Sequence, residues 1–261
     1  MRTNNHKRWN KGGNRAAALT LAAAAVALAA PQAQALDLNI YGVGHLSADA
    51  VDDGTDSGTA VASNSSRLGF RGGHDLGDGL RAIFQYEAGV DLTGQGGNDG
   101  NGPGSTNDIF TNARDSYVGF SGGFGTFVAG KLGGLNQWLY DYNLFADQVG
   151  DLGNIWGGSG LPGRVTSAAH YRTPDLNGLS VGFSFVPDED FTRSEDAYVV
   201  KADYAGGPLR LGAAYAQLNQ DAGDDWKVTA ITASYDLGGV TVGGGWQGES
   251  DMGGVAGNDR D

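Results

Sequence analysis

Several components are absent or scarce in this sequence of 261 residues, which has no cysteine and only six prolines. Without cysteine there is no disulfide bond and no thiolate metal site, so packing and hydrogen bonds alone must hold the fold. Beyond the N-terminal region, no apolar run approaches the roughly 20 residues of a transmembrane helix. Any insertion into a membrane could therefore use only β-strands.

Basic residues are also scarce, and several of them gather at the N-terminus. Residues 1–15 carry five Lys or Arg and no acid, the apolar run AAALTLAAAAVALAA follows at 16–30, and the small-residue pattern Ala-Gln-Ala ends at Ala35. This order predicts a secretory signal peptide over residues 1–35 and a mature start near Leu36. A membrane anchor is the alternative, but the run is short and rich in alanine.

The mature segment, residues 36–261, is strongly acidic. Of the 17 Lys and Arg, five fall in residues 1–35, which leaves 12 against 30 Asp and Glu and gives a net charge of −18. This charge argues against a nucleic-acid partner, which needs a basic surface. Catalysis has little support either, because His45, His74 and His170 show no Ser-His-acid order. We expect no enzyme activity, no cofactor and no metal site.

Glycine, by contrast, is abundant at 46 residues, and apolar residues recur with a period of two. In LRAIFQYEAGVDL, Leu80, Phe84 and Tyr86 share one face while Arg81, Gln85 and Glu87 share the other. This pattern predicts half-buried β-strands. About eleven such strands follow one another, joined alternately by tight turns and by longer polar loops, of which 52–63 is one.

Both the alternation of loop lengths and the composition of the two strand faces favour a membrane barrel over a soluble sandwich. A transmembrane barrel has short turns at one end and long loops at the other, apolar residues facing lipid and polar residues facing the lumen. Charged residues on a strand face are costly unless that face meets water. The sequence therefore predicts an all-β, antiparallel transmembrane β-barrel.

The longest segment without a strand or helix period runs over residues 133–163. It contains the acids Asp141, Asp147 and Asp151 among several aromatic residues, and no Lys or Arg. Loops of this length inside a compact domain are usually functional or disordered, and the aromatic residues argue against disorder. We expect an acidic loop that folds in against the β-strands.

Four segments together resemble the general diffusion porins of Gram-negative outer membranes: LDLNIYGVGHLSADA, SSRLGFRGGHDLGDGLRAIFQYEAGVDL, NARDSYVGFSGGFGTFVAGK and the loop with FADQVGD. The resemblance implies a 16-stranded barrel, a homotrimer in outer-membrane lipid, and passive diffusion of small hydrophilic solutes and ions. It further implies an infolded loop whose acids, Asp141, Asp147 and Asp151, face basic wall residues at a constriction. Arg67, Arg114 and Arg172 stand where the family carries its wall arginines, although each could instead be a solvated lumen residue.

Further lumen candidates are Arg71, Arg81 and Glu87, and the acidic mature segment favours a preference for cations. One departure from the family is that about eleven strands end in the polar stretch GGVAGNDRD. An unclosed sheet would leave exposed edges in lipid, so we expect the chain to be truncated at its C-terminus, with residues 36–261 forming an incomplete barrel domain. A structural or adhesive outer-membrane barrel with a plugged lumen is the alternative function.

Overall fold

The computed structural model describes residues 37–52, 54–94, 110–136, 138, 141, 146–148, 151, 161–188 and 196–261. Residues 35–261 form one compact unit. The expected signal peptide lies outside the described residues, and so do parts of the segment 133–163. No helix within the described ranges is long and apolar enough to span a membrane. A 3-10 turn, η3, covers Met252–Gly254.

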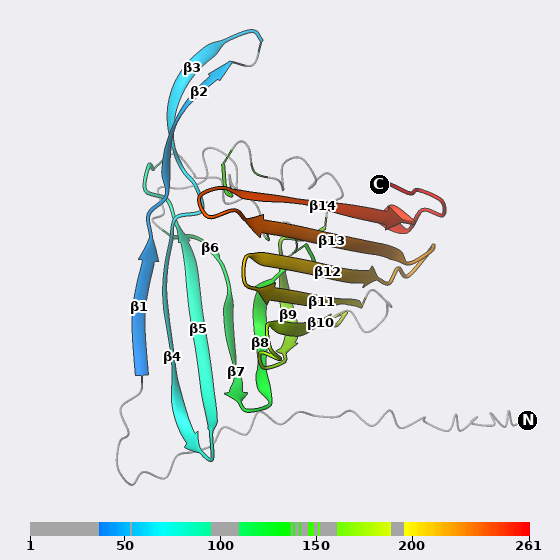
Figure 1. The fold of residues 1–261 in the computed structure, drawn as a ribbon. Helices are drawn as coiled ribbons and strands as arrows, with labels where there is room; N and C mark the ends of the chain where they lie inside the picture. The colour runs from blue at the N-terminus through cyan, green and yellow to red at the C-terminus, as the bar shows by residue number, and fades with distance from the viewer. Residues whose placement is uncertain are drawn as a thin grey trace, which may run out of the picture. The chain divides into compact units, whose positions relative to one another are not determined.

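The described part of the chain contains fourteen strands and confirms the all-β, antiparallel prediction (Figure 1). Their bounds are β1 (Asp37–Val43), β2 (Leu46–Asp52), β3 (Ser57–Ser63), β4 (Arg67–Gly77), β5 (Leu80–Val90), β6 (Phe110–Ala113), β7 (Ser116–Gly122), β8 (Gly125–Gly133), β9 (Arg164–Arg172), β10 (Leu179–Val186), β11 (Ala197–Gly206), β12 (Leu209–Leu218), β13 (Trp226–Asp236) and β14 (Thr241–Ser250).

Twelve strands form one sheet in the order β1-β4-β5-β7-β8-β9-β10-β11-β12-β13-β14, with β6 paired beside β5. The eleven strands along this path correspond to the eleven that the sequence predicts. Among the described residues, no pairing joins β1 to β14, so the sheet is open between these two edges. Closure of a barrel is therefore not part of the described structure.

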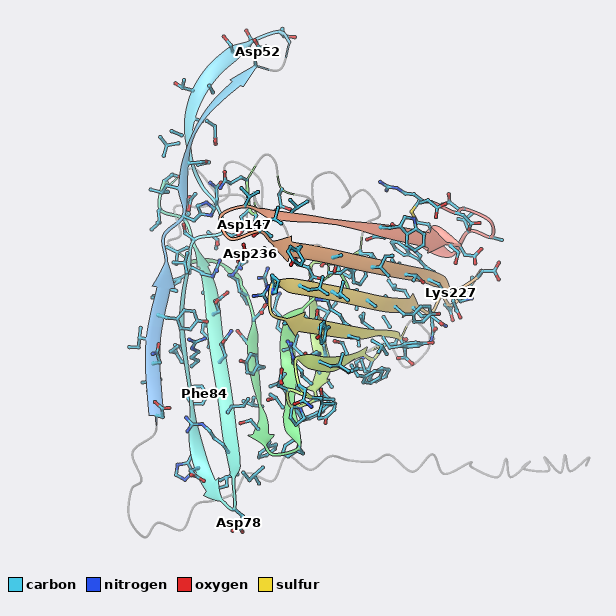
Figure 2. The ribbon with its side chains drawn as sticks, viewed as in Figure 1. Asp52, Asp78, Phe84, Asp147, Lys227 and Asp236 are labelled. Atoms are coloured by element: carbon cyan, nitrogen blue, oxygen red, sulfur yellow. The ribbon has the colours of Figure 1, made fainter. Side chains whose placement is uncertain are left out.

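Short and long connections alternate along this sheet, as predicted. Asp78 and Gly79 link β4 to β5, and residues 237–240 link β13 to β14, whereas residues 134–163 link β8 to β9. In Figure 2, Asp236 marks the short-turn end of β13 and Lys227 its other end. Because neighbouring strands are antiparallel, all the short turns fall at one end of the sheet and all the long connections at the other.

The sheet has one apolar and one charged face, and its register keeps them continuous from strand to strand. Ile40 pairs with Phe70, and Phe70 with Tyr86, on the apolar face. Phe70 stacks on Tyr86 with ring centroids 5.3 Å apart, and lies 6.5 Å from the ring of Phe84, which Figure 2 labels on β5. Large apolar side chains on this face stay exposed, up to 72% for Ile40. We call this the outer face.

The opposite, inner face carries the charged side chains and the main packed cluster. Leu135, Trp138 and Leu161, from the described part of segment 133–163, pack with Val199, Ala214, Ala216, Trp226, Val228 and Ala230 of β11, β12 and β13. Trp138 is only 1% exposed. These contacts place the two ends of the segment against the inner face of the sheet.

One local expectation was wrong. Residues 57–63, expected within a polar loop, form β3, which pairs with β2 in a separate two-stranded sheet. Leu46 pairs with Ser63, and Asp52 pairs with Ser57. Only Gly44 and His45 separate β1 from β2 along the chain. The run TAVAS has the β-branched and small residues of a strand, and the polar composition of the turn before it masked that signal.

Candidate functional site

The first cluster of predicted site residues centres on Glu87 of β5. Its carboxylate accepts a hydrogen bond from Nε of Arg114 at 2.7 Å and one from the Tyr41 hydroxyl at 2.8 Å. Nε of Arg67 lies 3.8 Å away. Glu87 and Arg114 are buried, at 7% and 8% exposure. The structure thus brings two of the three predicted wall arginines onto one buried acid.

Strand register explains why these groups meet. Tyr41 pairs with Gly69, and Gly69 with Glu87, so the three lie in one row across β1, β4 and β5. A Cβ on Gly69 would fall 2.7 Å from the Tyr41 ring, so the absent side chain leaves the space that this ring occupies. The Arg71 guanidinium lies 5.0 Å from the centroid of the same ring, a cation–π geometry.

A second cluster centres on Lys201 of β11, which sequence reasoning did not single out. Its Nζ lies 2.6 Å from Oδ1 of Asp141 and 2.8 Å from Oδ1 of Asp203. The hydroxyl of Thr232 on β13 donates to Oδ2 of Asp141 at 2.7 Å. Asp141 therefore contacts two wall strands directly, and this ion-paired group attaches the segment 133–163 to the sheet.

Arg172, the third predicted wall arginine, lies with this second cluster and apart from the first. Its Nη2 donates to the Ser180 hydroxyl at 2.7 Å and lies 3.9 Å from Oδ2 of Asp203. Its side chain is 55% exposed. The three predicted arginines therefore do not form one group, and a predicted acid, Asp141, shares a cluster with one of them.

The other two predicted acids lie close together. Oδ2 of Asp151 accepts from the backbone N–H of Asp147 at 2.5 Å, and the N–H of Asp151 donates to the carbonyl of Gln148 at 2.9 Å. Asp151 is buried at 7% exposure. Gln148 also approaches Nε2 of His45 at 3.1 Å, between β1 and β2. The role of Asp147 and Asp151 at a constriction stays a prediction.

Arg81, a weaker lumen candidate, forms an exposed ion pair 2.6 Å from Asp37. The alternation of β11 could have revealed Lys201 and Asp203, because VVKADYA places both opposite the apolar Val200 and Ala202. Pairing partners could not be read in the same way, since Asp141 and Lys201 are 60 residues apart.

A chain of three hydrogen bonds, partly buried, links Trp138 to the last two strands. Trp138 Nε1 donates to Oε1 of Gln247 at 2.7 Å, and Gln247 Nε2 donates to Oε1 of Glu249 at 2.7 Å. Trp226 Nε1 donates to the other oxygen of Glu249 at 3.0 Å. Since buried polar groups are costly when unpaired, these hydrogen bonds hold the segment in one position against β13 and β14.

Comparison with known proteins adds family evidence to this geometry. Residues 16–261 match a family of Gram-negative porins. The major outer membrane protein P.IB of Neisseria gonorrhoeae is 32% identical over 224 residues, which cover 80% of this chain and 58% of that protein. The outer membrane porin protein 32 of Delftia acidovorans is 31% identical over 237 residues, or 84% of this chain and 64% of the relative. This chain therefore spans less than two thirds of the length of both.

Among solved structures, the anion-selective porin from Comamonas acidovorans is similar with a TM-score of 0.59 and 23% identity. The likeness covers 82% of this chain and 68% of that one. At this identity it supports the fold alone, and it agrees with the antiparallel sheet described above.

Proposed function

This chain belongs to the family of Gram-negative porins, and from that membership we propose that it forms the wall of a water-filled channel for passive diffusion of small hydrophilic solutes and ions. Its relatives are major outer membrane proteins and porins, and the chain is an outer-membrane protein. Relatives of this kind are channels and not enzymes.

The observation that carries this proposal is the division of one sheet into an apolar and a charged face. Outer-face residues such as Ile40, Val118 and Ile231 are 72%, 66% and 54% exposed. The inner face carries Arg67, Glu87 and Lys201 in ion pairs. Only an apolar medium on one side and water on the other satisfies both faces at once.

We propose further that segment 133–163 narrows this channel, with Asp147 and Asp151 facing the wall arginines across the opening, while Asp141 is bonded to the wall itself through Lys201. The packing of Leu135, Trp138 and Leu161 on the inner face supports this placement. Opposed charges across a narrow opening would create a transverse field that orients polar solutes and selects ions by charge. Because the mature segment has 30 acids, we propose a preference for cations. The similar Comamonas porin is anion-selective, so the sign of the preference is worth measuring directly.

The proposed channel also has consequences for assembly. An unpaired strand edge in lipid leaves backbone polar groups unsatisfied at a cost of several kcal/mol each. Apart from the bridge between Glu249 and Arg260, the outer edges of β1 and β14 are unpaired within the described residues, and we propose that strands lie beside them in the membrane. We propose a closed barrel of the 16-stranded type found in this family, which assembles as a homotrimer. The first measurement is the intact mass of the protein in an outer-membrane fraction.

Planar-bilayer recordings of the purified outer-membrane protein test the channel. We expect stepwise conductance in KCl, and a reversal potential in a salt gradient that reports preference for potassium over chloride. A folded protein that inserts without conductance steps would contradict the channel and favour the adhesive, plugged barrel.

The double substitution Asp147→Asn with Asp151→Asn tests the acidic side of the constriction. We expect the cation-to-anion permeability ratio to fall by at least about twofold, because two charges at a low-dielectric opening act strongly on passing ions. Asp52→Asn, at the tip of the β2–β3 hairpin, is the matched control and should leave the ratio unchanged. Equal ratios in the double variant and the control would remove both acids from the constriction.

A further inference from the structure

The hairpin of β2 and β3 has no part in the proposed channel. It joins β1 to β4 at the end of the sheet opposite the short turn at Asp78 and Gly79, and Figure 2 shows Asp52 at its tip, beyond the main sheet. In outer-membrane barrels the short turns face the periplasm and the long connections face the outside of the cell. The hairpin therefore belongs to the external surface.

Both long edges of this hairpin are unpaired within the described ranges. β2 and β3 form a two-stranded sheet of their own, in which each strand pairs only with the other. Consecutive residue pairs, from Leu46 with Ser63 to Asp52 with Ser57, follow one register without a bulge. A two-stranded hairpin is at best marginally stable alone, and a regular unpaired edge is a template for another strand.

The usual protections of such an edge are missing from this hairpin. Proteins commonly block edge strands with lysine, proline or a β-bulge. Residues 46–63 contain no Lys, Arg or Pro, and the small side chains of Ala48 and Ala50 on β2 are exposed. The charged residues of this range are all acids, namely Asp49, Asp52, Asp53 and Asp56. The backbone of the edge is therefore accessible to a partner strand, and the charge beside it is negative.

The hydrogen bonds at the base of the hairpin identify which backbone groups of β2 point outward. The N–H of Asn64 donates to the carbonyl of His45 at 2.8 Å, so these two residues form a hydrogen-bonded pair. Hydrogen-bonded and non-hydrogen-bonded pairs alternate along an antiparallel ladder, and the register of β2 and β3 continues from this pair without a shift. The residues of β2 whose N–H and C=O point away from β3 are therefore Leu46, Ala48, Ala50 and Asp52.

The side chains beside this edge differ between the two faces of the hairpin. Leu46 and Ala48 share a face with Val61 of β3, and Leu46 and Val61 are each 51% exposed. Asp49 lies on the opposite face, where its carboxylate accepts a hydrogen bond from the Ser47 hydroxyl at 2.9 Å. A strand added beside β2 would meet apolar side chains on one face and a carboxylate on the other. Its own residues should alternate between apolar and basic, because successive side chains of a strand point to opposite faces.

We infer that the outer edge of β2 binds an extended, basic segment of another protein as a third strand of the hairpin. Main-chain hydrogen bonds to Ala48 and Ala50 supply the affinity, and lysine or arginine beside Asp49 supplies the specificity. A second copy of this chain does not fit the edge, because two acidic hairpins placed side by side bring like charges together. This binding does not depend on conduction through the channel.

Fluorescence anisotropy of a labelled peptide with the alternating sequence KVKVKVKV, added to the purified protein in a neutral detergent, tests the edge. We expect saturable binding above that to empty micelles. A peptide of the same composition in two blocks, KKKKVVVV, should bind at least about tenfold more weakly, because only the alternating order matches both faces of the hairpin.

Proline substitutions distinguish the two edges of the hairpin. Ala50→Pro removes an N–H from the outer edge of β2 and should raise the dissociation constant of KVKVKVKV at least about tenfold, since proline cannot donate to the added strand. Thr59 pairs with Ala50 and directs its N–H to the opposite edge, that of β3. Thr59→Pro is therefore the matched control and should leave the constant unchanged.

Asp49→Lys tests the charge beside the edge through a gain of binding as well as a loss. This variant should bind KVKVKVKV at least about fivefold more weakly, because an attraction is replaced by a repulsion. It should also bind the acidic peptide EVEVEVEV, which the wild type should not bind. A variant that merely misfolds does not gain this binding.

Absence of saturable binding of KVKVKVKV to the wild-type protein would overturn the inference. Equal dissociation constants for Ala50→Pro, Thr59→Pro and the wild type would also overturn it, because the peptide would then bind elsewhere, such as the acids of the inner face. A fall in oligomeric mass for Ala50→Pro but not for Thr59→Pro, measured by light scattering, would make the edge an interface between copies of this chain. Conductance in KCl without peptide is measured in parallel. A protein that binds the peptide but does not conduct would contradict only the proposed channel, and one that conducts but does not bind would contradict only the strand-binding edge.

Discussion

At the scale of single residues, the buried pair of Glu87 and Arg114 is where one substitution has the most effect. Their side chains are 9% and 10% exposed and 2.7 Å apart. The pair of Arg81 and Asp37 is as short, at 2.6 Å, but its side chains are 40% and 69% exposed. Removing one partner of a buried pair leaves an uncompensated charge, whereas exposed pairs contribute little because water solvates both ions.

We therefore expect Glu87→Gln to lower the free energy of unfolding by about 3 kcal/mol, and the control Asp37→Asn by less than about 1 kcal/mol. Urea unfolding of the protein in lipid vesicles, followed by tryptophan fluorescence, measures both. Adding Arg114→Met to Glu87→Gln should restore part of the loss, because the second change removes the stranded charge. Equal losses for Glu87→Gln and Asp37→Asn would contradict the assignment of Glu87 as the centre of its cluster.

At the scale of elements, the base of segment 133–163 is a clamp of two backbone hydrogen bonds. Gly134 N–H donates to the carbonyl of Gly163 at 2.9 Å, and Leu135 N–H to the carbonyl of Pro162 at 3.0 Å. A Cβ on Gly134 would lie 1.8 Å from the Pro162 carbonyl oxygen, while a Cβ on Gly163 would meet open space. Two glycines at the two ends of one loop therefore differ sharply in what they tolerate.

Gly134→Ala should force the two ends apart, at a cost of about 1–3 kcal/mol typical of overpacking. If opening is fast compared with cleavage, limited proteolysis within residues 133–163 should then accelerate about fivefold or more. Gly163→Ala is the control, with an expected rate close to that of the wild type. Equal proteolysis rates for the two variants would show that the hydrogen bond between Trp138 and Gln247, and not the two backbone hydrogen bonds at its base, holds the segment.

Elements were easier to predict from the sequence than contacts between them. The period of two in LRAIFQYEAGV fixes both faces of β5, because alternation depends only on neighbouring residues. The contacts of Arg67 and Arg114 with Glu87 depend on the register of β4 and β5. They also depend on a backbone hydrogen bond from the N–H of Arg114 to the carbonyl of Glu87. No local pattern encodes it. For the same reason the separation of Arg172 from the other two wall arginines became visible only with the sheet order.

At the scale of the whole molecule, the apolar outer face determines the medium in which the protein is stable. Large apolar side chains recur on this face in nearly every strand of the main sheet, among them Ile40, Phe70, Phe120, Phe183 and Ile231. Contiguous apolar surface of this kind drives association in water. In lipid the same surface is favourable, and polar side chains are tolerated only on the opposite face.

Two adjacent residues of β1 allow a direct test of this division. Ile40 pairs with Phe70 on the outer face, and Asn39 pairs with Arg71 on the inner face. Both side chains are exposed in the isolated sheet, so water alone would accept a charge at either position.

We expect Ile40→Arg to destabilise the protein in vesicles by about 2–4 kcal/mol if it lies near the bilayer midplane, since a lipid-facing arginine loses its hydration there. Asn39→Arg, one residue away, should cost less than about 1 kcal/mol because its side chain meets water. Urea unfolding in vesicles compares the two variants. If Asn39→Arg destabilises the protein as much as Ile40→Arg does, the inner face does not meet water. That result would contradict the proposed channel and favour a barrel with a filled interior.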